Sequence, residues 1–108
     1  HGTFVAALVS GIDGNGAGGR GVAGATPIIP VRVTVGGSIS SADLAAGIVA
    51  AVDAGARVVN LSLGGPGFSE LERSAIDYAL ARDVVVVASA GNEGDAGNPL
   101  IYPAAYVG

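Results

Sequence analysis

The feature that most constrains the fold is an apolar run near the end of the chain, VVVVAS, from Val84 to Ser89. Only its last residue carries a polar side chain, so the run shows no alternation between an apolar and a polar face. A strand of this kind is typical of a parallel sheet whose two faces are both covered by other elements. We therefore predict a buried strand here, within a parallel sheet.

The rest of the chain alternates between predicted helices and predicted strands. Apolar residues at helical spacing predict helices at residues 2–10 and 41–55, and a third that starts near Ser69. Shorter apolar runs predict strands at Ile28–Val33 and Arg57–Ser62, although the proline in the first of these favours a strand start or a sheet edge. This alternation predicts an α/β fold, in which helices sandwich a parallel β-sheet and the crossovers are right-handed.

Polar residues mark where the second and third helices begin. Ser40 or Ser41 can cap the second helix, and Gly55 can end it. Ser69 and Glu72 form the S-x-x-E pattern of a capping box at the start of the third helix. These signals fix where the predicted helices should start.

Small residues follow two of the predicted strands. Ser62-Leu63-Gly64-Gly65 follows one strand, and Ser89-Ala90-Gly91-Asn92 follows the last. In open parallel sheets ligands gather at the carboxyl ends of the strands, and glycine lets a ligand backbone approach closely. We therefore expect a binding site at this edge of the sheet.

The composition excludes several classes of function. Nine acidic residues against five arginines give a net charge of −4 with no basic patch, so we expect no nucleic-acid partner. The chain has no cysteine, which excludes disulfides and thiolate zinc sites. Its apolar runs are too short to span a membrane. The 108 residues begin at His1 without an initiator methionine, and we interpret them as one piece of a larger domain.

A glycine-rich loop contains a deceptive motif. Residues Gly14–Gly19 match G-x-G-x-x-G, the pattern of dinucleotide-binding loops. That fingerprint must follow a strand and open a helix, whereas this stretch follows a helical pattern and leads toward a strand. We interpret it as a surface loop, and we expect no nucleotide binding.

Few side chains in this sequence could perform catalysis. His1 is the only histidine, and histidine is the usual general base, although a lone histidine is often only a surface or core residue. Ser62, Ser89 and Asn92 follow the predicted strands, where such residues are more often turn or cap residues than catalytic ones. Taken singly, none of these residues identifies a reaction.

Taken together, four stretches resemble the subtilisin-like serine proteases. His1–Ala6, HGTFVA, resembles that family's histidine motif, H-G-T-H-V-A-G. Val59–Gly65 is similar to its substrate-binding strand, V-I-N-M-S-L-G-G, and Val84–Gly94 to its oxyanion-hole segment, V-V-V-A-A-A-G-N-E-G. Tyr102–Tyr106 is similar to its Y-P-A-x-Y stretch. These stretches occur in the family's order and at about its spacing.

The resemblance implies a fold and a mechanism. The fold would be the three-layer αβα, subtilisin-like architecture, incomplete here, with residues 1–108 forming part of the peptidase catalytic domain. His1 matches the general base of a Ser-His-Asp triad. Asn92 matches the oxyanion-hole asparagine, whose amide donates to charge that develops in the transition state. The implied function is that of a serine endopeptidase.

The resemblance also implies a groove for polypeptide substrates. A strand edge would pair with an extended substrate backbone, and small residues would leave the main specificity pocket open to a large apolar side chain. The opposite rim would come from Val35–Gly37. The residues implied in binding are Ser62, Leu63, Gly64, Ala90 and Gly91.

Several further expectations come from the family rather than from the residues. No cofactor is expected, although many relatives bind structural calcium near the equivalent of Asp13–Gly19. Asp13 and Asn15 could supply oxygen ligands, but a tight calcium site normally needs six or more oxygens, and we assign no metal site. Most relatives are secreted, which favours an extracellular location. A pro-segment or an inhibitor could be a further partner.

Two triad members have no counterpart in this sequence. The family's aspartate motif, D-[ST]-G, precedes the histidine, and its serine motif, G-T-S-M-A, follows the oxyanion asparagine. Neither is present, and Ser62, Ser69 and Ser89 stand in other contexts. We therefore expect residues 1–108 alone to be inactive. The alternative is a non-catalytic peptide-binding or structural relative on the same fold, although a groove alone would need neither His1 nor Asn92.

Overall fold

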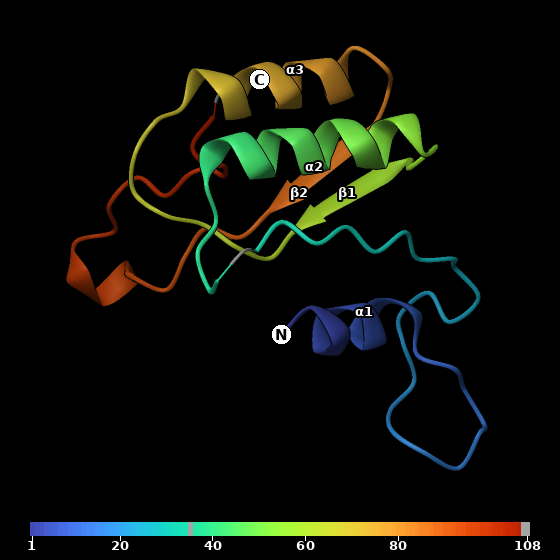
Figure 1. The fold of residues 1–108 in the computed structure, drawn as a ribbon. Helices are drawn as coiled ribbons and strands as arrows, with labels where there is room; N and C mark the ends of the chain where they lie inside the picture. The colour runs from blue at the N-terminus through green and yellow to red at the C-terminus, as the bar shows by residue number, and fades with distance from the viewer. Residues whose placement is uncertain (35, 107–108) are drawn as a thin grey trace. The chain divides into compact units, whose positions relative to one another are not determined.

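The computed structural model describes residues 1–34 and 36–106, which divide into two compact units, His1–Pro30 and Val31–Gly108. The described residues form three α-helices, a two-stranded parallel sheet and one short 3-10 helix (Figure 1). This is a partial αβα fold, and it confirms the predicted α/β class. The elements in chain order are α1 (Gly2–Ser10), α2 (Ser41–Asp53), β1 (Val58–Leu61), α3 (Glu70–Leu80), β2 (Val85–Ala88) and η1 (Gly94–Ala96).

The smaller unit consists of α1 and the chain that folds back onto its end. Helix α1 has the predicted bounds, but none of its residues is buried within the described structure. Phe4 and Leu8 are 65% and 54% exposed. Backbone hydrogen bonds fix the returning chain, among them those from Val22 N–H to the Leu8 carbonyl (3.0 Å) and from Ala23 N–H to the Val9 carbonyl (2.7 Å).

The glycine-rich loop after α1 needs its glycines for backbone conformation. Gly14, Gly16 and Gly18 have φ values of 75°, 75° and 67°, a region that other residues rarely adopt. The Asn15 side chain accepts a hydrogen bond from Ala17 N–H at 3.0 Å. The loop follows a helix and leads into turns rather than into another helix. It therefore lacks the structural context of a dinucleotide-binding motif.

The larger unit is a parallel β-α-β arrangement in which α3 connects β1 to β2. Val58 pairs with Val85 and Leu61 with Ala88. Figure 1 shows α2 and α3 side by side over the same face of the sheet. The apolar faces of both helices meet the sheet because their apolar residues recur at helical spacing. The resulting core consists of Leu44, Ile48, Ala51, Val52, Val59, Leu61, Ala75, Ile76, Ala79 and Val84.

The opposite face of the sheet is mostly apolar, although it also carries Asn60, and it is exposed in the described structure. Val58, Val85 and Val87 are 58%, 56% and 48% exposed. An all-apolar strand predicts two covered faces, and the described residues of the larger unit cover only one of them. The uncovered face is therefore a surface suited to packing against further chain.

The predicted strand at Ile28–Val33 is wrong for the described structure, which assigns no strand there. Pro30 has no backbone N–H to donate to a ladder, and a strand also requires a partner. The last part of this segment instead packs on α2, where a Cβ on Gly47 would lie 3.4 Å from a methyl of Val31 and still closer to a methyl of Val33. The other two strands are confirmed, each slightly shorter than predicted.

The predicted helix caps are confirmed for α2 and α3. The Ser40 hydroxyl accepts a hydrogen bond from Asp43 N–H at 3.0 Å, and the Ser69 hydroxyl accepts one from Glu72 N–H at 3.4 Å. No helix among the described residues is long and apolar enough to cross a membrane.

The capping box of α3 is completed by a distant residue, Tyr106. Ser69 N–H donates to the Tyr106 hydroxyl oxygen at 3.0 Å, and that hydroxyl donates to Glu72 Oε2 at 2.9 Å. The hydroxyl therefore lies between the two groups that would bond directly in an ordinary capping box. This arrangement satisfies the Glu72 carboxylate, although that residue is only 8% exposed.

Replacing Tyr106 with phenylalanine is expected to lower the free energy of unfolding by about 1–3 kcal/mol. The change leaves Ser69 N–H and a buried Glu72 carboxylate without their shared partner, and an unsatisfied buried polar group has a cost of that order. Denaturant unfolding of the full-length protein measures the loss. Tyr102→Phe is the matched control, since the contacts of Tyr102 described here are made by its ring and its backbone. Equal stability of the two variants would contradict this account.

The same hydroxyl predicts a loss of stability at alkaline pH. Burial, with a further contribution from the Glu72 hydrogen bond, raises the pKa of Tyr106 above its ordinary value of 10.0. Because the folded pKa exceeds the unfolded one, the stabilisation is fully present below about pH 10 and is lost as the pH rises through the folded pKa. Unfolding measured from pH 8 upward should show a smaller alkaline loss in Tyr106→Phe than in the parent. Parallel curves would contradict the prediction.

Candidate active site

The carboxyl ends of β1 and β2 lie together, as expected for neighbouring parallel strands. The ladder continues one step beyond β2, because Ser89 N–H donates to the Leu61 carbonyl at 3.1 Å. Further along, a Cβ on Gly64 would lie 3.7 Å from the Ser89 carbonyl oxygen. The structure therefore brings the two predicted binding segments, Ser62–Gly64 and Ala90–Gly91, to one edge of the sheet.

Two serines at this edge accept local hydrogen bonds, as turn residues commonly do. The Ser89 hydroxyl accepts a hydrogen bond from Gly91 N–H at 3.3 Å. The Ser62 hydroxyl accepts one from the Asn60 side-chain amide at 2.9 Å. Both contacts shape the chain where the strands end.

Asn92 follows a glycine whose backbone directs it out of the sheet. Gly91 has a φ of 89°, which favours glycine, and the chain turns there. The backbone N–H of Asn92 donates to Glu93 Oε2 at 2.7 Å, and Asn92 itself is exposed. The local arrangement thus engages the backbone of Asn92 and presents its side-chain amide at the surface.

A second segment supports the loop that follows β1. Gly65 and Tyr102 form an antiparallel bridge with hydrogen bonds of 3.0 and 2.9 Å. The Tyr102 ring packs on Tyr106 and Phe68, with ring centroids 4.8 and 5.9 Å apart. The Tyr102–Tyr106 motif was evident in the sequence, but this supporting role was not predicted from it. The repeated tyrosine at a spacing of four was the available signal.

His1 and the predicted pocket rim are placed differently from the other candidates. His1 belongs to the smaller unit, where it is exposed and directly precedes α1 as its N-cap residue. Asn92 and the predicted substrate-binding residues belong to the larger unit. Of the predicted rim, Val35 lies outside the described residues, and Gly36 and Gly37 form a turn.

The side chains suggested for calcium have protein partners within the smaller unit. Asp13 pairs with Arg20 at 3.6 Å, and Asn15 accepts the hydrogen bond from Ala17. Among residues 1–34 and 36–106, no three His, Cys, Asp or Glu side chains cluster as metal ligands.

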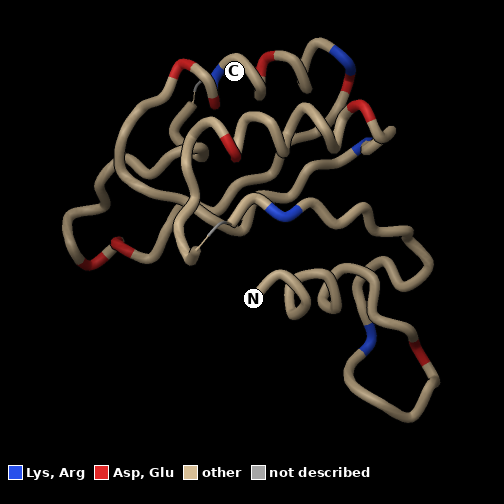
Figure 2. Tube along the Cα trace, in the orientation of Figure 1, with Lys and Arg blue, Asp and Glu red and all other residues tan. Residues whose placement is uncertain are grey.

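In the larger unit, Figure 2 shows arginines on separate segments rather than on one face, and acidic residues on the loop around η1.

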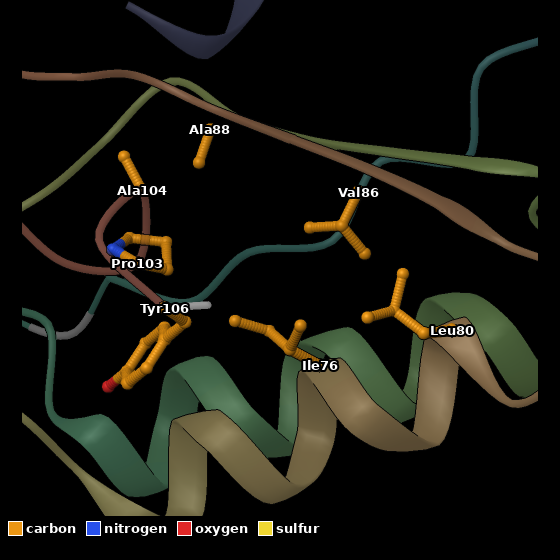
Figure 3. A pocket seen from close by; sticks show the side chains of 7 residues that line it. All are labelled: Ile76, Leu80, Val86, Ala88, Pro103, Ala104 and Tyr106. Carbon is orange, nitrogen blue, oxygen red and sulfur yellow. The ribbon is translucent and has the colours of Figure 1, made fainter. Parts of the chain in front are cut away.

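A pocket of about 310 Å³ lies beside the candidate site but shares no residue with it. Figure 3 shows apolar side chains from α3, from β2 and from residues 103–106 converging on this pocket. The Tyr106 hydroxyl points away from it. Figure 3 shows no polar group of these side chains directed into the pocket, whereas ligand sites usually add a few placed polar groups to an apolar lining. The lining residues are Ile76, Leu80, Val86, Ala88, Pro103, Ala104 and Tyr106.

Comparison with known proteins identifies the family. The model of the subtilase family, Peptidase_S8, matches residues 1–108. This chain belongs to the subtilase family. The match confirms the resemblance drawn from the sequence motifs, and it agrees with the partial αβα fold.

Relatives of this subtilase chain include several named proteases. It is 41% identical over 109 residues to subtilisin DY from Bacillus licheniformis, covering 98% of this chain and 39% of that protein. It is 39% identical to the thermophilic serine proteinase of Bacillus sp. strain AK1, covering 98% and 26%. It is 42% identical to the cell wall-associated protease of Bacillus subtilis strain 168, covering 96% and 11%. The chain thus spans two-fifths or less of each of these relatives.

Proposed function

We propose that this chain is the central part of the catalytic domain of a serine endopeptidase. The observation that carries the proposal is the placement of Asn92, an exposed amide directly after a glycine turn at the carboxyl end of β2. Its backbone N–H is already bonded to Glu93, so the side-chain N–H is the donor left for a substrate. A side-chain donor at this place would stabilise the oxyanion that forms in acyl transfer.

His1 is proposed as the general base of the same reaction. It is the only histidine in the chain, and it precedes an apolar helix as the family's histidine motif does. In this role it takes the proton of the serine nucleophile and later donates it to the leaving amine.

The substrate in this proposal is an extended polypeptide. Ser62, Leu63 and Gly64 continue directly from the carboxyl end of β1, and in this proposal their backbone pairs with a substrate strand. Ala90 and Gly91 form the adjoining wall, where small side chains let the substrate approach Asn92. A pro-segment or a protein inhibitor would bind the same groove in the same extended form.

The remaining triad members are proposed to come from sequence outside residues 1–108. The triad requires an aspartate that orients the histidine and a serine that attacks the carbonyl carbon. In this proposal residues 1–108 alone do not hydrolyse peptides. An extracellular location is proposed as well, supported by a relative that is named as cell wall-associated.

Sequencing the coding region on both sides of this segment tests the proposal. We expect a D-[ST]-G aspartate upstream of His1 and a G-T-S-M-A serine downstream of Asn92. If either residue is missing or replaced, the peptidase proposal fails. The groove at Ser62–Gly64 would then belong to a non-catalytic peptide-binding relative.

A further inference from the structure

The carboxylate of Glu93 folds back onto the turn that carries Asn92. Its Oε2 accepts the hydrogen bond from Asn92 N–H at 2.7 Å, although Glu93 follows Asn92 in the chain. The same oxygen lies against Gly91, where a Cβ would overlap with it. A larger residue than glycine at that position would therefore displace the carboxylate from the Asn92 peptide.

The main chain of Glu93 is anchored to the segment that follows. Its carbonyl oxygen accepts hydrogen bonds from Ala96 N–H at 3.0 Å and from Asn98 N–H at 3.1 Å. Glu93 is also the N-cap residue of η1, but its side chain makes no capping hydrogen bond there. The side chain is instead directed back to Asn92. Glu93 thus joins the Asn92 peptide to η1.

This hydrogen bond bears on the side-chain amide of Asn92, because the peptide that it holds carries that side chain. Hydrogen bonds to a carboxylate are roughly twice as strong as those between neutral groups. A catalytic group that is misplaced by about 1 Å can cost about 100-fold in rate. An oxyanion donor on an exposed turn therefore depends on whatever fixes the turn.

We propose that Glu93 is a positioning residue for Asn92, and that its carboxylate holds the Asn92 peptide so that the side-chain amide keeps the orientation the transition state requires. The inference rests on the proposed peptidase function and adds to it a residue that acts through Asn92. A negative charge near a developing oxyanion would by itself oppose catalysis. The benefit of Glu93 therefore lies in the hydrogen bond that it accepts, and a neutral acceptor should provide it as well.

Three substitutions of Glu93 in the full-length protein separate position from charge. Glu93→Ala removes the acceptor, so kcat should fall by about 10- to 100-fold while KM changes little. Glu93→Gln keeps a carbonyl oxygen at the same reach and should restore most of the parent kcat. Glu93→Asp keeps the charge on a side chain that is one methylene shorter, and its kcat should be lower than that of Glu93→Gln.

Asp95→Ala is the matched control, because it removes another exposed carboxylate, one that belongs to η1. It should leave kcat and KM near the parent values. The fold of each variant is checked by circular dichroism.

A double-mutant cycle shows whether Glu93 acts through Asn92. In the Asn92→Ala background the amide that Glu93 positions is already gone. Adding Glu93→Ala there should lower kcat by no more than about 2-fold, which is the usual error of additivity. A residue that acted independently would instead cause the same loss in both backgrounds.

Three results would overturn the inference in folded variants. The first is a parent-like kcat in Glu93→Ala, and the second is a loss in Glu93→Gln as large as that in Glu93→Ala. The third is a double variant in which the two single losses multiply. If the parent cleaves no peptide and reacts with no fluorophosphonate, the proposed function itself fails, and the inference fails with it.

Discussion

Replacing His1 with alanine in the full-length protein is expected to abolish peptide hydrolysis. If His1 is the general base, its loss leaves the serine nucleophile with its proton, and the leaving amine receives none. In subtilisin, a member of the same family, removal of the catalytic histidine costs about 10⁶-fold in kcat, and we expect a loss of that order here. Steady-state kinetics with a sensitive peptide substrate measures it.

Arg20→Ala is the control for this experiment, because it changes an exposed residue of the same compact unit. Its ion pair with Asp13 is exposed, and exposed pairs contribute little to stability. The control should therefore keep nearly full activity. Retention of more than a small fraction of activity by a folded His1→Ala variant would remove His1 from the role of general base.

Replacing Asn92 with alanine is the second large effect expected. In the proposed role, the amide donates to charge that is present in the transition state but not in the bound substrate, so kcat should fall while KM changes little. The loss of this donor in subtilisin costs about 10²–10³ in kcat, and membership in the same family makes that the expected size here. Separate values of kcat and KM are therefore the required measurement.

Asn15→Ala is the matched control for Asn92, since it removes an exposed asparagine amide from the glycine-rich loop. It should leave both kcat and KM near the parent values. If Asn92→Ala instead raised KM and preserved kcat, the side chain would bind the substrate uniformly rather than stabilise the transition state.

Local signals predicted much of this fold. The bounds of α1 and the serines that cap α2 and α3 are those read from the sequence, because helix periodicity and caps depend on residues within a few positions. The parallel pairing of β1 and β2 also follows from the alternation of strands and helices. The strand predicted at Ile28–Val33 failed because pairing depends on a partner elsewhere in the chain.

Long-range contacts at the site escaped the sequence analysis. The strand ends were expected to meet, and they do, because neighbouring parallel strands end at one edge. The Tyr106 hydroxyl, however, reaches a helix start 37 positions away, and the pattern S-x-x-E alone predicted a box without it. Ile101 contacts Gly64 across a similar distance in sequence. Neither contact has a local signature, since each depends on how the segment after η1 returns to the sheet.

The most direct test of the central claim is to label the full-length protein with a fluorophosphonate and to locate the modified serine by peptide mapping. The reagent reacts with a serine that a general base has activated. We expect a single labelled serine within G-T-S-M-A, outside residues 1–108, and no labelling in the His1→Ala variant. Absence of labelling in the parent, or labelling of a serine within residues 1–108, would contradict the assignment of this chain to a working serine peptidase.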